Sequence, residues 1–279
     1  MQALLSAQNP DGGWGYRRGG SSWVEPSVYA LLALRDLPEA AEAVRRGRAW
    51  LRGLQRADGG WAPHAAVRES TWVTALVLLL EGLEGAGDRA LGWILRQTGR
   101  EATWLYRARM KLLGVSSDYE AAPPAWPWYP GTAAWVMPTS ITLLALRKVS
   151  KVRPEAEIRE RIREGRRFLL VRRCADGGWN HGSSKALGFQ INSYPETTGL
   201  ALLALEAEKA PGLERSLEAA ERHLARCRSA EGAAWLEMGL RAHGRPASAP
   251  SSLREDTLMD AALRLLARRA AQGNNPLLG

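Results

Sequence analysis

The sequence contains no apolar run long enough to cross a membrane and almost no cysteine. The most apolar stretch, residues 75–80, stops at Glu81, whereas a membrane-spanning helix needs about 18 or more apolar residues. The N-terminus has no basic stretch followed by an apolar one, so no secretory signal is expected. Two cysteines, Cys174 and Cys227, cannot form a disulfide framework and fit a reducing compartment. We therefore predict a cytoplasmic, globular protein.

Lysine is also scarce, so the formal net charge of +9 comes mainly from arginine. The densest basic run, 159–173, is interrupted by Glu160 and Glu164 and carries apolar residues at helical spacing. This pattern is typical of the solvated face of a helix rather than of a surface that follows phosphates. We expect no nucleic-acid partner, while attraction to an anionic membrane surface stays open.

Phenylalanine is scarce as well: the sequence has 2 Phe and 6 Tyr but 12 Trp, which indicates a repeated motif that contains tryptophan. The motif reads QNPDGGW at 8–14, QRADGGW at 55–61 and RCADGGW at 173–179. A further copy is reduced to WPWYPG at 126–131. Because a Gly-Gly pair supplies the positive φ that ends a helix in a tight turn, each copy predicts a helix before it.

A nearly all-apolar segment follows each of these turns. The clearest copies are 23–34, 135–146 and 194–205, and looser ones are 70–80 and 256–267. They carry Leu and Ala on nearly every side, so as helices they must be buried all round, whereas the helices before the turns are amphipathic. Such an alternation closes most naturally into a ring, with an open superhelical stack as the competitor. We predict an all-α fold, an α/α toroid of about five helical hairpins with inner apolar and outer amphipathic helices.

The predicted repeats form a single domain over residues 1–279. Their approximate bounds are 1–37, 40–84, 87–149, 155–208 and 213–270. The first repeat begins partway through the motif, so its outer helix is expected to be truncated. We therefore predict that residues 1–8 form a shortened helix that is less well ordered than the later outer helices.

Residues 46–61, RGRAWLRGLQRADGGW, resemble the QW motif of squalene-hopene and oxidosqualene cyclases. Residues 165–179 repeat the pattern with Arg173 in place of Gln, and 3–14 match its second half. The resemblance covers essentially the whole chain. It implies an α/α toroid of the superfamily that also contains the protein prenyltransferases, with turn tryptophans that brace adjacent helices. Complete triterpene cyclases have two toroid-type domains, whereas only one fits here.

The resemblance also implies a position for a catalytic acid. In the cyclases that protonate an alkene or epoxide, an Asp-x-Asp-Asp-Thr motif begins an inner helix, and its middle Asp is the general acid. The nearest match is LREDT at 253–257, in which Glu255 stands at the position of the acid and Asp256 follows it. Glu196 is a second candidate. The alternative is that Asp256 and Glu196 are helix caps or first-turn acids favoured by the helix dipole.

The starts of the inner helices should surround one mouth of the ring. The residues there that we expect to bind substrate are Glu25, Trp23, Trp135 and Tyr194. Faces of Trp and Tyr rings stabilise cations, which suits carbocation chemistry. His181 follows a turn tryptophan in a polar loop, so it could reach this mouth as a catalytic acid or base, or belong to an ordinary surface loop.

His223 and Cys227 are four residues apart on one helix face, which is a spacing of metal ligands. They fall on a predicted outer helix, from which a central site is hard to reach. We therefore predict no metal and no cofactor.

Three functions stay open at this stage. The first is a terpenoid-cyclase-like protein that binds an apolar isoprenoid in a central cavity and cyclises it by acid-initiated carbocation chemistry. The second is a non-catalytic lipid-binding or scaffold toroid that has lost the acid motif. The third is a prenyltransferase-like subunit, which would need zinc and a partner chain. A closed apolar chamber with an inward acid favours the first function, and a filled centre favours the second.

The stretch 119–131 is rich in proline and unusually aromatic for a loop. Trp128 and Tyr129 could lie among lipid headgroups, which would give peripheral association with the inner face of the membrane. The alternative is that Trp126 and Trp128 pack in the reduced turn. The register of the repeats favours this alternative.

Overall fold

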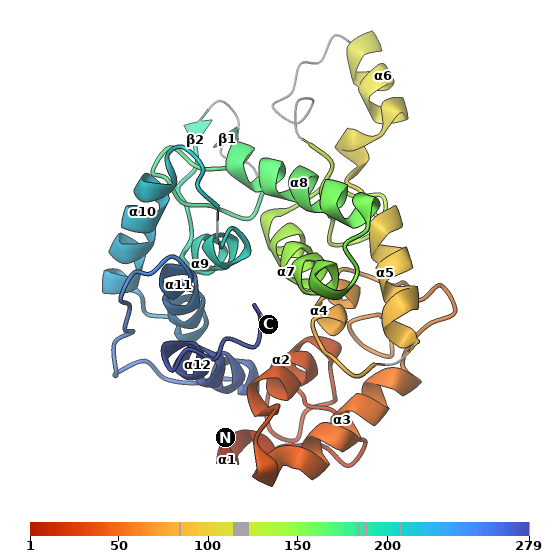
Figure 1. The fold of residues 1–279 in the computed structure, drawn as a ribbon, viewed down its shortest axis with the longest axis vertical. Helices are drawn as coiled ribbons and strands as arrows, with labels where there is room; N and C mark the ends of the chain where they lie inside the picture. Colours follow the sequence, from red (N-terminus) through yellow and green to blue (C-terminus); the bar gives the residue numbers. More distant parts are fainter. Residues whose placement is uncertain (84, 114–122, 183–184, 187–188, 207, 279) are drawn as a thin grey trace.

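The computed structural model describes residues 1–83, 85–113, 123–182, 185–186, 189–206 and 208–278, whose helices form a closed ring (Figure 1). Among these residues, six helices line the inside of the ring. They are α2 (Val24–Leu34), α4 (Val73–Leu78), α7 (Val136–Val152), α9 (Pro195–Ala204), α11 (Ala230–Ala242) and α12 (Leu258–Ala271). Each packs on the next, and α12 packs on α2, which closes the ring.

A second layer of helices surrounds the inner ones. It consists of α1 (Gln2–Leu5), α3 (Ala41–Gly53), α5 (Ala86–Arg96), α8 (Ala156–Val171) and α10 (Leu213–Arg226). Most inner helices are buried on nearly every side because their sequences are apolar all round, whereas α12 and the last turn of α7 also expose charged residues. The outer helices, apart from the four-residue α1, bury one face only. The predicted all-α toroid is confirmed.

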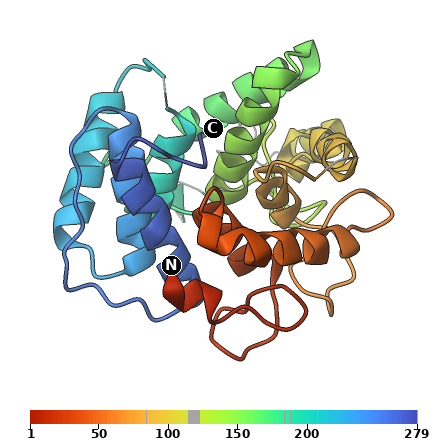
Figure 2. The ribbon, with the colours of Figure 1, turned by 60° about the horizontal axis from the view of Figure 1, so that its bottom comes forward.

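The structure adds one inner helix that the sequence pattern left inside the last predicted repeat, 213–270. This helix is α11, and no Gly-Gly-Trp turn precedes it. The connection from α11 to α12 contains no outer helix. Instead, α1 from the start of the chain packs beside α12, as Figure 2 shows. The two ends of the chain therefore complete the ring together.

The turn tryptophans hold the outer helices. The indole N–H of each donates to a backbone carbonyl of the preceding outer helix, in the pairs Trp14–Leu4 (2.8 Å), Trp61–Leu51 (2.8 Å), Trp179–Leu169 (2.7 Å) and Trp126–Ile94 (3.0 Å). Because Trp126 makes the same bond as the others, the reduced third turn keeps this structural contact.

The glutamine of the turn connects it to the next outer helix. The side chain of Gln55 donates to the carbonyl of Ala86 at 2.8 Å, and that of Gln8 donates to the carbonyl of Ala43 at 2.8 Å. Where Arg173 replaces glutamine, its guanidinium donates to the carbonyl of Pro211 at 3.0 Å, just before α10. The arginine therefore makes an equivalent connection.

Hydrogen bonds at the N-termini of the inner helices join consecutive repeats. The backbone N–H at the start of an inner helix donates to the carbonyl two residues after the next turn tryptophan, in the pairs Val24–Pro63 (3.0 Å), Trp72–Trp128 (3.2 Å) and Val136–His181 (2.8 Å). The last inner helix returns to the first repeat, because Leu258 N–H donates to the carbonyl of Tyr16 at 2.8 Å. Ring closure thus holds Tyr16 at this mouth.

Shorter elements lie outside the two layers. They are η1 (Pro38–Ala40), η2 (Arg100–Ala102), the projecting helix α6 (Trp104–Leu112) and the antiparallel strands β1 (Lys185–Ala186) and β2 (Phe189–Gln190). In the described part of the chain, no helix has the length and apolar character needed to span a bilayer.

Candidate active site

Four carboxylates from four consecutive inner helices lie at one mouth of the ring. They belong to the first turns of α2, α9, α11 and α12 and are Glu25, Glu196, Glu231 and Asp260. The charges of the other three all raise the pKa of Glu231, which places the four close together. Among the described residues, no Lys or Arg lies within ion-pair distance of any of them. We call this group the carboxylate cluster.

The Glu25 carboxylate accepts a short hydrogen bond from the hydroxyl of Tyr16. Burial raises the pKa of Glu25, and the hydrogen bond from Tyr16 opposes this rise. Burial and the charge of Glu25 raise the pKa of Tyr16, so the phenol keeps its proton and remains a donor. The ring centroids of Tyr16 and Trp23 lie 5.7 Å apart, and those of Trp23 and His64 lie 4.5 Å apart. Aromatic rings therefore border Glu25 at the mouth.

Glu231 has a pKa suited to proton transfer near neutral pH. Burial raises its pKa from 4.5 to about 7, with further contributions from the charges of Glu25 and Glu196. A carboxyl group with such a pKa keeps its proton in about half of the molecules at pH 7. Shifts of this kind are typical of catalytic acids, although structural networks of charges produce them too.

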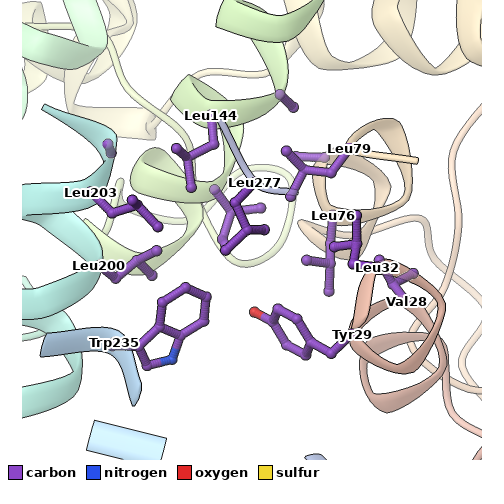
Figure 3. Packing of buried hydrophobic residues seen from close by; sticks show 14 of the residues in the cluster. Val28, Tyr29, Leu32, Leu76, Leu79, Leu144, Leu200, Leu203, Trp235 and Leu277 are labelled. Atoms are coloured by element: carbon purple, nitrogen blue, oxygen red, sulfur yellow. The ribbon is translucent and has the colours of Figure 1, made fainter. Parts of the chain in front are cut away.

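An aromatic layer lies one helical turn below the carboxylate cluster. Tyr29 follows Glu25 by one turn of α2, and Trp235 follows Glu231 by one turn of α11. Their rings are 5.8 Å apart at an interplanar angle of 71°. Both side chains are fully buried, and the Tyr29 hydroxyl points into the ring, where it has no hydrogen-bond partner among the described residues (Figure 3). The mouth thus leads from carboxylates to an aromatic wall.

Beyond this layer, the centre of the ring is filled by Leu277. The side chain is fully buried, and Figure 3 shows it among Leu79, Leu144 and Leu203 of the inner ring. It belongs to the segment Asn274–Leu278, which follows α12 into the middle of the ring (Figure 1). The apolar interior is therefore closed from the side opposite to the carboxylate cluster.

The site residues expected from the sequence lie in three places: in or beside the carboxylate cluster, before α12, and on the rim of the mouth. Glu25 and Glu196 belong to the carboxylate cluster, and Trp23 lies half-buried beside it. Glu255 and Asp256 are exposed and precede α12. A capping role for Asp256 does not occur, because the N-cap of α12 is Thr257, which forms a capping box with Asp260.

The remaining expected residues lie on the rim. Tyr194 and His181 are exposed, with ring centroids 5.2 Å apart. Trp135 is exposed next to Gly182, and its ring would lie 3.0 Å from a Cβ at that position. Tyr194 is the N-cap of α9 and Glu196 lies in the first turn of the same helix, so this aromatic edge borders Glu196.

Sequence reasoning missed Glu231, Asp260 and Tyr16. A signal for Glu231 was present, because Ser229 is a good N-cap residue and an acid two positions later is typical of a helix start. The structure confirms that cap, since the Ser229 side chain accepts from the N–H of Gly232 at 3.2 Å. Nothing local in the sequence places Tyr16 against Glu25.

The aromatic stretch considered for membrane contact is mostly packed. Trp126 is buried in the third turn, and Trp128 is half-buried with its ring 4.9 Å from that of Trp72. Tyr129 is exposed, and residues 119–122 lie outside the described residues. Membrane contact through Trp128 and Tyr129 stays a prediction.

His223 has a hydrogen-bonding role in the fourth turn. Its Nε2 lies 2.7 Å from the hydroxyl of Ser193, which also donates to Asp176 at 2.8 Å. In the described ranges of the chain, no group of three or more His, Cys, Asp or Glu is arranged to hold a metal ion.

The chain was compared with protein-family models and with the sequences of known proteins. No family model matches the chain. It is 35% identical over 77 residues to labda-7,13-dienyl diphosphate synthase of Streptomyces clavuligerus, covering 27% of this chain and 14% of that protein. It is 25% identical over 119 residues to squalene–hopene cyclase of Zymomonas mobilis, covering 36% of this chain and 18% of that protein. The matched part is thus less than a fifth of either relative.

The solved structures extend the likeness to the whole fold. Type II terpene cyclase MstE from Scytonema, in complex with geranylgeranyl dihydroxybenzoate, matches with a TM-score of 0.55 at 17% identity, over 95% of this chain and 75% of that one. Endoglucanase Cel10 of Klebsiella pneumoniae matches with a TM-score of 0.61 at 15% identity, over 98% and 99%. Since toroids of different chemistry match equally well, structural likeness describes the fold alone.

Proposed function

This chain is a relative of the terpenoid cyclases, and on that premise we propose that it binds an apolar isoprenoid at the carboxylate-lined mouth of its ring and cyclises it by protonation. Glu231 is the proton donor. The observation that carries the proposal is the meeting of four first-turn carboxyl groups one turn above the buried aromatic rings, where burial and neighbouring charges raise the pKa of Glu231 to about 7. The binding of an isoprenoid by the cyclase MstE supports the substrate class.

The proposed reaction uses groups at this mouth. The Glu231 proton passes to an alkene carbon of the substrate, whose π electrons form the new C–H bond and leave a cation on the neighbouring carbon. Glu25, Glu196 and Asp260 carry negative charge close to this cation, and the faces of Tyr and Trp rings stabilise it further. A second alkene attacks the cation to close a ring. Loss of a proton to a carboxylate then restores neutrality, so the product is an isomer of the substrate.

The test is incubation of the purified chain with a panel of linear isoprenoids, followed by analysis of extracts for cyclic products. Glu231→Gln keeps the shape of the side chain but removes the acidic proton, so it should abolish product while substrate binding persists. Glu255→Gln is the matched control, because Glu255 is exposed, and it should retain activity. Undiminished product from Glu231→Gln would overturn the assignment.

A second function is favoured by the filled centre of the ring. Leu277 occupies the space that a closed reaction chamber would need, which suits a non-catalytic lipid-binding or scaffold toroid. The same panel distinguishes the two functions. Binding of isoprenoids by the wild-type chain without any cyclic product supports the second, and cyclic product supports the first.

A further inference from the structure

The segment Asn274–Leu278 enters the ring without belonging to any helix. Its Leu277 side chain lies at the centre, fully buried, while Pro276 is buried as well and Leu278 packs partly buried against the core. Within the segment, the N–H groups of Leu277 and Leu278 bond to Asn275, to its side-chain oxygen at 3.1 Å and its carbonyl at 3.1 Å. The segment is therefore a compact turn that presents Leu277 to the centre.

Two lysines of α7 hold this turn in place. Lys148 Nζ donates to the carbonyl of Pro276 at 3.2 Å, and Lys151 Nζ donates to the carbonyl of Leu278 at 2.9 Å. Lys148 also pairs with Glu81 at 3.1 Å, and Glu81 is shared with Arg35 at 3.3 Å. The attachment thus consists of the apolar side chains of Pro276, Leu277 and Leu278 and two hydrogen bonds from ammonium groups to neutral carbonyls.

An open groove borders the same lysines. It has a volume of about 590 Å³ and runs between the segment after α4, the start of α5 and the C-terminal part of α7. Its apolar lining includes Leu79, Leu80, Leu83, Leu91, Val149 and Val152. Its polar edge consists of Lys148, Lys151, Arg153, Glu81 and Asp88, so three cations face two carboxylates. Leu79 lines the groove and also lies beside Leu277, so the groove is adjacent to the space that Leu277 fills.

The two mouths of the ring carry different charged groups. The N-terminal ends of the inner helices carry the carboxylate cluster, whereas the opposite mouth carries Lys148, Lys151 and Arg35 together with Glu81, which pairs with Lys148 and Arg35. An ammonium group binds an anionic oxygen more strongly than a neutral carbonyl oxygen. A linear molecule with one anionic end would therefore enter in a single direction, with its head at the lysines and its chain toward Glu231.

We propose that the ring centre and the adjoining groove form a binding site for a linear amphiphile with an anionic head, and that Asn274–Leu278 is the built-in competitor for this site. The apolar chain takes the place of Leu277, and the head takes the place of the Pro276 and Leu278 carbonyls at the two lysines. The inference rests on the proposed function in placing an apolar ligand inside the ring, but it does not require any reaction.

The test compares the full chain with a chain that ends at Gly273. The probe is dodecyl phosphate, with dodecanol as a neutral molecule of the same chain length and inorganic phosphate as a free head, all followed by titration calorimetry. Removal of the segment should raise the affinity for dodecyl phosphate at least tenfold, with weaker binding of dodecanol and none of inorganic phosphate. Equal affinity of the two chains, both shown to be folded by circular dichroism, would overturn the proposal.

Substitutions in the shortened chain test the head site. Lys148→Met and Lys151→Met should each reduce the preference for dodecyl phosphate over dodecanol, whereas Lys111→Met, on the projecting helix α6, should not. An unchanged preference in both lysine variants would contradict the assignment of the head.

A second measurement works even if the shortened chain fails to fold. In the full chain, hydrogen exchange at the amides of Leu277 and Leu278 should accelerate when dodecyl phosphate is added, because the ligand releases the turn. Exchange that does not change at saturating probe contradicts displacement. Both readouts are independent of cyclic products, so failure of the cyclisation assay leaves this inference standing, and failure here leaves the role of Glu231 untouched.

Discussion

The guanidinium of Arg269, on the last inner helix, donates to the carboxylate of Asp36, just after the first inner helix, at 3.0 Å. The same guanidinium donates to the carbonyls of Arg35 at 2.6 Å and Ala33 at 3.0 Å, which lie at the C-terminal end of α2. Helix ends leave such carbonyls without partners inside the helix. One buried arginine therefore satisfies the end of α2 and joins α12 to α2 where the ring closes.

We expect Arg269→Met to lower the free energy of unfolding by about 3 kcal/mol, because it removes the buried donor of the carbonyls at the end of α2 and leaves Asp36 with Arg35 alone. Urea unfolding followed by circular dichroism measures this change. Arg268→Met is the matched control, since Arg268 is exposed on the same helix, and its effect should stay below about 0.5 kcal/mol. A loss in Arg269→Met no greater than in the control would show that the ring closes without this contact.

The third turn should contribute to stability like the others, although its Gly-Gly pair is missing. Trp126→Phe and Trp61→Phe each remove an indole donor and leave the buried carbonyl with a backbone donor alone, so each should cost about 1–2 kcal/mol. Trp104→Phe, at a side chain that is 74% exposed, should be nearly neutral. A neutral Trp126→Phe alongside a costly Trp61→Phe would mean that the reduced turn no longer braces its helix. Thermal unfolding of the three variants measures these losses of stability.

Gly59 should tolerate alanine much less well than Gly131, although both have positive φ. Gly59 has φ of +94°, and a Cβ there would lie 2.6 Å from the carbonyl oxygen of Arg89 in the next outer helix. Gly131 has φ of +77° with nothing within 4 Å of an added Cβ. Left-handed backbone alone costs an alanine about 1–2 kcal/mol, so Gly131→Ala measures that part. The loss in Gly59→Ala should exceed it by at least about 1 kcal/mol, and equal losses would exclude the steric contribution.

Glu231 should make stability depend on pH. Because its pKa in the folded protein, about 7, lies above the ordinary 4.5, the protonated form stabilises the fold, and this stabilisation is lost as the pH rises from about 4.5 through 7. Between pH 5 and 8 the free energy of unfolding should fall by about 2–3 kcal/mol more in the wild type than in Glu231→Gln. Denaturant titrations at both pH values provide the measurement, with Glu255→Gln as a control that behaves like the wild type. A parallel pH dependence in all three chains would falsify the shifted pKa.

Much of the architecture follows from local sequence. The apolar character of 23–34, 135–146 and 194–205 determines that these helices are buried, because a helix with Leu and Ala on every side has no face to expose. The Gly-Gly-Trp turns determine where outer helices end. Even the reduced third turn was recognisable, since its tryptophan keeps the spacing of the repeat. The inner helix α11 escaped this pattern because no such turn introduces it.

Only part of the candidate site could be predicted from local sequence. The sequence pattern identifies Glu25 and Glu196 as first-turn acids on inner helices. The acid motif of the cyclases, by contrast, points to Glu255, which the fold leaves exposed. Glu231 becomes important only because ring closure brings it beside Glu25, Glu196 and Asp260. Its pKa depends on burial and on charges from helices far apart in the chain, and neither is a local property.

By itself, then, the sequence determined that this chain forms a ring of buried helices braced by tryptophan turns, because helix periodicity and turn chemistry act over a few residues. Only the tertiary structure decided which carboxylates meet and what occupies the centre. Leu277 is an ordinary leucine in the sequence. It fills the ring because closure of α12 on α2 directs the residues after α12 inward, where Lys148 and Lys151 donate hydrogen bonds to the carbonyls of Pro276 and Leu278.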